Sequence, residues 1–255
     1  MKVLVCVKRV PAPGAKINLT ADERAVDTAF LGFTVSPHEE CAVEAAVQLV
    51  EQHGGSSTVL TLGPAESEEQ LRYAVSTGVD HAALVLTDGG DWDPQRTARA
   101  LASAIAALEA DRGPFDLILF GNESADSGGF QVGIRVAHAL GRPVVNGIKG
   151  IDVDGSALRV RREADAGVEV YAVPMPCVLG VKEGINLPRY PTLKGRLASK
   201  KVPVSSSQPV DLPGGQQMVR FARPTETASE TQILGTGPEA ASAIVDLLEE
   251  IGVLK

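Results

Sequence analysis

One loop of the sequence combines glycine, serine and acidic residues in an order that suits the binding of a phosphate group. Glycines let backbone N–H groups approach a phosphate closely, serine hydroxyls can donate hydrogen bonds, and a following helix start adds a favourable potential. The same residues also suit an ordinary strand-to-helix loop, so the pattern alone leaves nucleotide binding and a purely structural loop as alternatives. The loop runs Gly121, Asn122, Glu123, Ser124, Ala125, Asp126, Ser127, Gly128, Gly129, Phe130, Gln131 and Val132, and ends at Gly133.

The sequence shows none of the established motifs for nucleotide hydrolysis or nucleophilic catalysis. The patterns GxGxxG, GxxxxGK[ST] and GxSxG do not occur, and no pair of catalytic carboxylates stands out. His38 has the most suggestive position of the four histidines, in the first turn of an expected helix, but a solvated residue of that turn is the competing interpretation. We therefore expect a bound ligand without the groups needed to cleave it.

The composition excludes several classes of protein. Of 255 residues, 44% are hydrophobic and 22% charged, and the formal net charge of -8 argues against a nucleic-acid binder. Cys6, Cys41 and Cys177 are too scattered for a disulfide framework or a metal site. No apolar run approaches the roughly 20 residues of a membrane span. These features predict a cytoplasmic protein that binds no metal and crosses no membrane.

Strands and helices alternate through the first 140 residues. A helix is expected from Pro37, because Ser36 can cap it, proline suits its first turn and Glu39 completes a capping box. Such alternation predicts an α/β fold with an open, mainly parallel sheet and helices on both faces. The expected strands are 2–8, 58–62, 81–87 and 115–120, and the expected helices are 37–53, 65–77, 94–110 and about 133–140.

The pattern changes after residue 143. Residues 158–162 and 168–173 are typical of an antiparallel pair, and 177–181 of a further strand. Residues 200 to about 237 have no sustained period, which fits either a flexible linker or an arm that lies on a partner. An amphipathic helix is expected over 238–251. We predict a nucleotide-binding α/β domain over 1–200, followed by a C-terminal arm and helix over 201–255.

Five segments, in this order, resemble the β subunit of the electron-transfer flavoproteins. Each is modest alone, but together they cover nearly the whole chain. They are Val3–Pro11, Ser36–Ala46, Thr61–Pro64, Gly121–Gly133 and Leu187–Gly195. The resemblance implies an adenine-nucleotide α-hydrolase-like fold, and an electron carrier subunit that is not itself an enzyme.

The resemblance also implies a ligand and the residues that contact it. AMP would be buried in this chain, and FAD would be shared with an α subunit that holds most of it. His38 would lie near the flavin ring. The residues expected to contact AMP are Cys6, Ser36, Pro37, His38, Glu39, Leu62 and the loop from Gly121 to Val132.

Three kinds of partner follow from the same resemblance. The α subunit would be contacted by the arm after Lys200 and by Glu163, which would pair with a basic residue across the interface. Arg189, Tyr190 and Leu193 would dock donors, namely acyl-CoA or other flavin dehydrogenases, with Leu193 as the anchor. Electrons would pass to a quinone oxidoreductase or a similar acceptor.

The loop departs from the pattern of the family, which leaves the ligand open. The family loop has Ala-Ile-Asp and then Asn-Gln-Thr-Gly or Ala-Gln-Val-Gly, whereas this chain has Ser124–Asp126 and Gly129–Gly133. Electron-bifurcating members bind a second FAD in place of AMP, so that variant is an alternative. A stand-alone adenine-nucleotide hydrolase or sensor is a further alternative from a different class.

Overall fold

The computed structural model describes residues 1–255 except 91, 211–213, 225–230 and 255. The described chain divides into two compact units, Met1–Arg220 and Phe221–Lys255. The expected domain boundary between residues 200 and 201 stays a prediction.

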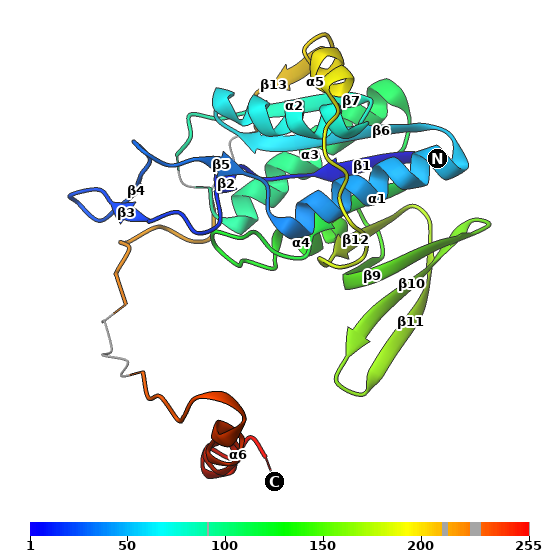
Figure 1. The fold of residues 1–255 in the computed structure, drawn as a ribbon. Coiled ribbons are helices and arrows are strands. Elements are labelled where there is room, and N and C mark those ends of the chain that lie inside the picture. The colour runs from blue at the N-terminus through cyan, green and yellow to red at the C-terminus, as the bar shows by residue number, and fades with distance from the viewer. Residues whose placement is uncertain (91, 211–213, 225–230, 255) are drawn as a thin grey trace. The chain divides into compact units, whose positions relative to one another are not determined.

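The first unit is built on a nine-stranded sheet, in the order β11-β10-β9-β12-β8-β1-β6-β7-β13 (Figure 1). In this order, each pair of neighbouring strands from β9 onward to β13 is parallel. At the other end, β10 pairs antiparallel with both β9 and β11. The sequence-based prediction of an open, mainly parallel α/β sheet is therefore confirmed. The bounds are β1 Lys2–Cys6, β6 Ser56–Gly63, β7 His81–Leu86, β8 Leu117–Gly121, β9 Val144–Asp154, β10 Ala157–Ala164, β11 Gly167–Pro174, β12 Cys177–Val181 and β13 Val204–Ser207.

Helices cover both faces of the sheet and form two separate cores. Successive residues of a strand point to opposite faces. Val3 and Val5 of β1 thus pack under α1 and α2, whereas Leu4 packs under α3 and α4. The helices are α1 Pro37–His53, the 3₁₀ turn η1 Ala65–Ser67, α2 Glu68–Thr77, α3 Pro94–Arg112, α4 Val132–Ala139 and α5 Leu193–Ser199.

Local capping explains where the two longest helices begin. The Ser36 hydroxyl accepts from the Glu39 N–H, and the Glu39 carboxylate accepts from the Ser36 N–H, so the predicted capping box is present. The Asp93 carboxylate caps α3 in the same way, by accepting from the Gln95 N–H at 2.8 Å. Each helix has proline in its first turn. The helices expected over 37–53 and from 94 are confirmed.

Several strands were not predicted from the sequence. β9 is eleven residues long and pairs with both β10 and β12. β13 lies within the stretch for which no periodic structure was expected, and it forms the sheet edge next to β7. Two small antiparallel pairs also occur between β1 and α1, namely β2 Val10–Pro11 with β5 Phe33–Thr34, and β3 Asn18–Leu19 with β4 Val26–Asp27.

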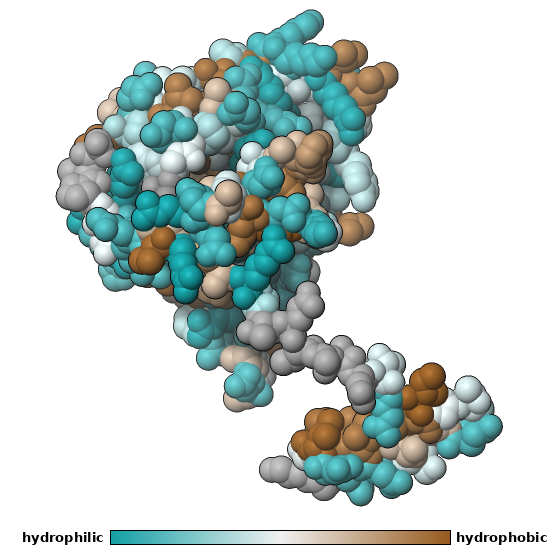
Figure 2. Space-filling view, turned by 90° about the vertical axis from the view of Figure 1, so that its left-hand side faces the viewer, coloured by the Kyte–Doolittle hydropathy of each residue, from teal (hydrophilic) through white to brown (hydrophobic). Residues whose placement is uncertain are grey.

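The described residues of the second unit include the helix α6 Ala240–Glu250, preceded by the 3₁₀ turn η2 Gly237–Glu239. This confirms the helix expected over 238–251. None of the residues of α6 is buried within the described chain. Figure 2 shows apolar side chains gathered on the visible face of this unit. The exposed large apolar side chains of α6 and the residues after it are Ile244, Val245, Ile251, Val253 and Leu254.

Candidate functional site

The carboxyl ends of four neighbouring parallel strands, β12, β8, β1 and β6, meet at one edge of the sheet. Ligands of open α/β proteins bind at such an edge. The start of α1 closes against it: a Cβ added to Gly121 would lie 2.7 Å from Glu39 Cγ and 3.3 Å from His38 Cβ. The fold therefore brings together the helix start 36–39 and the loop 121–132, which are far apart in the sequence.

Glu39 is a buried carboxyl group at the centre of this edge. Its Oε2 accepts hydrogen bonds from the backbone N–H groups of Lys8, at 3.1 Å, and of Ser36, at 3.3 Å. Burial raises the pKa of Glu39 to about 8, against the effect of these donors. Burial, and to a lesser degree Glu39, also raises the pKa of the nearby Cys6 thiol well above its usual range. Cys6 is therefore a poor nucleophile at neutral pH.

His38 joins three segments of the chain. Its Nδ1 accepts a hydrogen bond from the backbone N–H of Glu183 at 2.8 Å, and its Nε2 lies 3.3 Å from Glu123 Oε1. The ring is largely buried between the start of α1, the loop after β8 and the turn after β12. The imidazole thus has a fixed orientation at the strand edge, rather than the solvated position that was the competing expectation.

Hydrogen bonds within the loop 121–132 give it a defined shape. The Gly128 N–H donates to the Ser124 carbonyl at 2.9 Å, and the Ser124 and Ser127 hydroxyls lie 2.8 Å apart. Asp126 forms an ion pair with Lys8 at 2.7 Å. Partial burial opposes ionisation of Asp126, but Lys8, together with hydrogen bonds from Ser124 and Ser127, outweighs that effect, so the pKa of Asp126 lies below its usual value. The negative charge of this loop is thus offset by a lysine that follows the end of β1.

The end of this loop fits a phosphate group. Gly128 and Phe130 both have positive φ, +53° and +50°, and such turns orient successive N–H groups to one side. The residue that precedes α4, Gln131, makes no side-chain cap, and the first turn holds no acidic residue. A Cβ on Gly129 would meet nothing in the described chain closer than 4.0 Å. The backbone here is therefore accessible to an anion.

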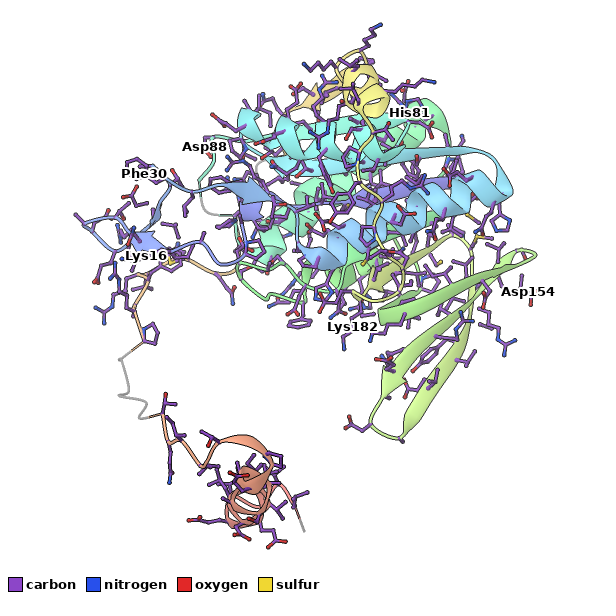
Figure 3. The ribbon with its side chains drawn as sticks, in the orientation of Figure 1. Lys16, Phe30, His81, Asp88, Asp154 and Lys182 are labelled. Carbon is purple, nitrogen blue, oxygen red and sulfur yellow. The ribbon has the colours of Figure 1, made fainter. Side chains whose placement is uncertain are left out.

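A concavity lies at the same end of the sheet, beyond β7. Figure 3 shows His81 and Asp88 at opposite ends of this strand, with Asp88 at the carboxyl edge. Pro94, at the start of α3, would lie 4.0 Å from a Cβ on Gly129. The one sequence signal near this concavity is the Asp93-Pro94 helix start, which follows a strand. None of the residues that line the concavity was among the predicted site residues. Its volume is about 430 Å³, and its lining is Leu86, Thr87, Asp88, Trp92, Arg96, Gln208 and Pro209.

The residues expected to dock partners lie elsewhere, on a segment that follows β12, lies against α1 and leads into α5. Tyr190 is 90% exposed and Leu193 76% exposed. Arg189 behaves differently, because its guanidinium forms ion pairs with Glu44 and Glu51 of α1. The structure thus leaves two apolar side chains free for a partner and ties the neighbouring arginine to the body of the protein.

Glu163 lies at the end of β10, in the antiparallel part of the sheet. Its carboxylate forms an ion pair with Lys149 of β9 at 2.6 Å, and this hydrogen bond lowers the pKa of Glu163. Its side chain stays largely exposed. The expected pairing of Glu163 with a second subunit stays a prediction. Within the described residues, no group of three or more His, Cys, Asp or Glu side chains could hold a metal ion.

No helix in the described part of the chain combines the length and apolar character needed to cross a membrane. The fold and the strand edge define an open α/β protein with a loop suited to a phosphate-containing ligand. The sequence model of the electron transfer flavoprotein domain matches residues 26–212.

Relatives agree with that match. The chain is 35% identical to the electron transfer flavoprotein subunit beta of Syntrophomonas wolfei over 235 residues, 91% of this chain and 90% of the relative. It is 30% identical to the subunit beta of Bacillus subtilis, with 97% of each chain covered. It is 34% identical to that of Megasphaera elsdenii, with 79% of this chain and 76% of the relative covered. The chain belongs to the electron transfer flavoprotein β-subunit family.

Proposed function

We propose that this chain is the β subunit of a heterodimeric electron carrier, in which it binds AMP and helps to enclose an FAD held mainly by an α subunit. Membership of the family supports this role, and relatives are named as one subunit of a flavoprotein. The FAD supplies the chemistry, because it can accept electrons from one protein and pass them to another. The residues of this chain would bind the AMP and help to orient and shield the FAD.

The single observation that carries AMP binding is the accessible backbone at Gly129 before the uncapped start of α4. A phosphate there would gain N–H donors and the helix potential. The Lys8–Asp126 ion pair reduces repulsion between the loop and the phosphate. Cys6, Ser36–Glu39 and Leu62 would contact the nucleotide around this point.

The groups at the strand edge suit a carrier rather than a catalyst. The raised pKa of the Cys6 thiol keeps it from acting as a nucleophile, and hydrogen bonds hold the His38 ring in place. His38 would lie near the flavin ring and form part of its enclosure. The three cysteines are free and buried, which suits a reducing compartment such as the cytoplasm.

Donor dehydrogenases would dock on the exposed side chains before and within α5. Exposed apolar side chains in a firmly held loop are typical of anchors that enter a pocket on a partner. Tyr190 and Leu193 have this character, with Leu193 as the anchor. Acyl-CoA or other flavin dehydrogenases would be the donors, and a quinone oxidoreductase or a similar protein the acceptor. Glu163 and the unit Phe221–Lys255 would contact the α subunit.

The experiment that tests the ligand is release of the nucleotide from the purified heterodimer by denaturation, followed by chromatography. We expect one FAD and one AMP for each heterodimer. Two FAD molecules would replace this proposal with the electron-bifurcating alternative, which the mixed loop sequence leaves open. ATP turnover by the isolated chain would favour a stand-alone hydrolase instead.

A substitution at Gly129 locates the nucleotide. Because a Cβ there would make only ordinary van der Waals contacts, at 4.0 Å, Gly129→Ala is expected to leave stability unchanged and to reduce the bound AMP. Gly32→Ala is the matched control, since its Cβ would also make an ordinary contact, at 3.8 Å, but outside the loop. Full AMP occupancy in the Gly129 variant would show that the nucleotide does not lie on this backbone.

A further inference from the structure

The segment that follows β12 is fastened to α1 at regular intervals. Each contact joins a residue of α1 to the residue 145 positions later, and the contacts recur every three residues along both segments. The segment therefore runs along the helix in the same direction, from the nucleotide edge toward the docking loop. The three pairs are His38 with Glu183, Cys41 with Asn186, and Glu44 with Arg189.

The last of these contacts is the most extensive. Arg189 Nε and Nη2 donate to the two oxygens of Glu44, at 2.9 and 3.0 Å, and the Arg189 backbone N–H donates to Glu44 Oε2 at 3.1 Å. Nη1 and Nη2 donate to the two oxygens of Glu51, at 2.7 and 2.9 Å. Glu44 and Glu51 are two helical turns apart, so one guanidinium bridges both. A planar fork with two bidentate partners fixes position as well as charge.

The Glu44 side chain, which binds Arg189, is itself held in place. It is only 4% exposed, and one of its oxygens also accepts a hydrogen bond from Gln48 at 2.7 Å. Arg189 is therefore held by a buried carboxylate that has its own support on the helix. A buried carboxylate that loses its cation is costly, which opposes release of the arginine.

The side chains on either side of Arg189 point away from the protein. Leu187 is 89% exposed and Tyr190 is 90% exposed. Apolar side chains of a loop free to rearrange would gain by folding back onto the surface. The part of the loop that carries Leu187 and Tyr190 is thus held by the ion pairs of Arg189 and not by burial of these two side chains.

We propose that Arg189, through Glu44 and Glu51, is a positioning residue for electron transfer from the donor, and that it holds Leu187 and Tyr190 in the orientation that the donor recognises. This inference rests on the proposed docking function of the same loop. It assigns Arg189 to the body of this chain, in place of a direct contact with the partner, and adds Leu187 to the contacting side chains. Pre-ordering of a loop lowers the entropy lost on association.

The test uses the purified heterodimer as electron acceptor for a flavin-dependent donor dehydrogenase. Arg189→Gln is expected to raise the KM for the heterodimer roughly fivefold and to leave kcat within about twofold, because loop order is lost before docking and the flavin is untouched. The flavin absorption spectrum should stay unchanged. Arg189→Lys, which keeps the charge but loses the fork, should lie between the wild type and Arg189→Gln. Unchanged KM in a folded Arg189→Gln heterodimer would overturn the inference.

Two further variants separate this effect from general destabilisation. Arg161→Gln removes an ion pair with Asp152 in the β9–β10 hairpin and should leave KM unchanged. Glu51→Gln removes only the exposed half of the Arg189 clamp, and should raise KM roughly two- to threefold even if Arg189→Gln fails to fold. An unchanged KM in Glu51→Gln together with a misfolded Arg189→Gln would overturn the positioning role.

Coupling shows whether Arg189 acts through its neighbours. In a Leu187→Ala, Tyr190→Ala background, Arg189→Gln should add little to KM, because the side chains that it positions are gone. A full additional increase would mean that Arg189 acts by another route and would overturn the inference. Leu193→Ala distinguishes failure of the positioning role of Arg189 from failure of the docking function of the loop. If it raises KM and Arg189→Gln does not, only the inference fails; if neither changes KM, the docking function fails as well.

Discussion

The backbone N–H of Glu183 donates a hydrogen bond to Nδ1 of His38 at 2.8 Å. A ring nitrogen can accept only when it is unprotonated, so the proton of a neutral His38 must be on Nε2. Nε2 faces Glu123 Oε1 at 3.3 Å, which is a long hydrogen bond. One imidazole thus links the glycine-rich loop 121–132 to the segment that carries the proposed docking residues.

The first prediction concerns the tautomer of His38. At pH 8, two-bond ¹H–¹⁵N correlation spectra of the labelled protein should show His38 in the Nε2–H form alone, because the Glu183 N–H occupies Nδ1. The exposed His53 at the end of α1 should show a mixture of tautomers and serves as the control. A His38 signal from the Nδ1–H form would show that the bond to Glu183 is absent in solution.

The second prediction is a pH-dependent stability difference between the wild type and Glu39→Gln. The pKa of Glu39 is raised from 4.5 to about 8 in the folded protein, so the folded state binds a proton more tightly than the unfolded state between these values. The contribution of Glu39 to stability is therefore present below about pH 4.5 and is lost as pH rises toward 8. The slope cannot exceed about 1.4 kcal/mol per pH unit.

Thermal unfolding of both proteins between pH 5 and 9 measures this difference. The amide introduced by Glu39→Gln cannot ionise, and it keeps an oxygen for the N–H groups of Lys8 and Ser36. The Tm of Glu39→Gln should therefore rise relative to the wild type up to about pH 8 and then level off. A difference that is constant over this range would show that Glu39 is already ionised at pH 5.

Asp126→Asn tests a stability contribution at the same site whose pH dependence has the opposite sign to that of Glu39. The pKa of Asp126 is lowered by Lys8, so its stabilising contribution is present above the unfolded value of 3.8 and is lost as pH falls through the folded value. The variant should be less stable than the wild type at pH 7, by under about 1 kcal/mol because the pair is partly exposed. Chemical denaturation at pH 7 and at a series of pH values falling below 3.8 should show this cost and then its progressive loss. A cost that stays equal over the whole series would exclude the Lys8 pair as its source.

Much of the fold could be predicted from the sequence because its signals are local. The capping box of Ser36 and Glu39, and the Asp93-Pro94 start, lie within a few residues of the helices that they define. β13 could not be predicted, because Val204–Ser207 has one apolar residue and is a strand only through its pairing with β7, more than 120 positions earlier. β9 was missed because Gly147 and Gly150 interrupt its pattern.

The site was predictable in outline but not in its contacts. The strand-loop-helix order placed the glycine-rich loop at the correct edge of the sheet. The Lys8–Asp126 pair joins residues 118 positions apart, and no local pattern indicates it. The ion pairs of Arg189 could not be predicted either, because sequence alone cannot show that two glutamates of α1, seven residues apart, face it across the fold.

A further prediction is that Gly121→Ala disturbs the whole strand edge. The added Cβ would lie 2.7 Å from Glu39 Cγ and 3.2 Å from the Glu39 backbone nitrogen, so the start of α1 would have to move. We expect a loss of about 1–3 kcal/mol in the free energy of unfolding, together with loss of bound nucleotide. Denaturant unfolding and nucleotide analysis of the same preparation measure both. Gly121→Ala with wild-type stability would show that α1 does not abut β8 as described.

The final prediction concerns α6, whose apolar side chains are not buried by the described residues of its own unit. Ile244, Leu247, Leu248 and Ile251 have the spacing i, i+3, i+4 and i+7, so they share one face of the helix. If that face packs on the α subunit, Ile244→Asp should weaken the heterodimer at least roughly tenfold, because a charge would be buried in an apolar contact. Asp246→Ala, on the opposite face, should leave affinity unchanged. Titration of labelled α subunit with each variant measures the dissociation constant, and equal values for both would exclude this face from the interface, leaving the apolar residues of α6 without the partner that their exposure requires.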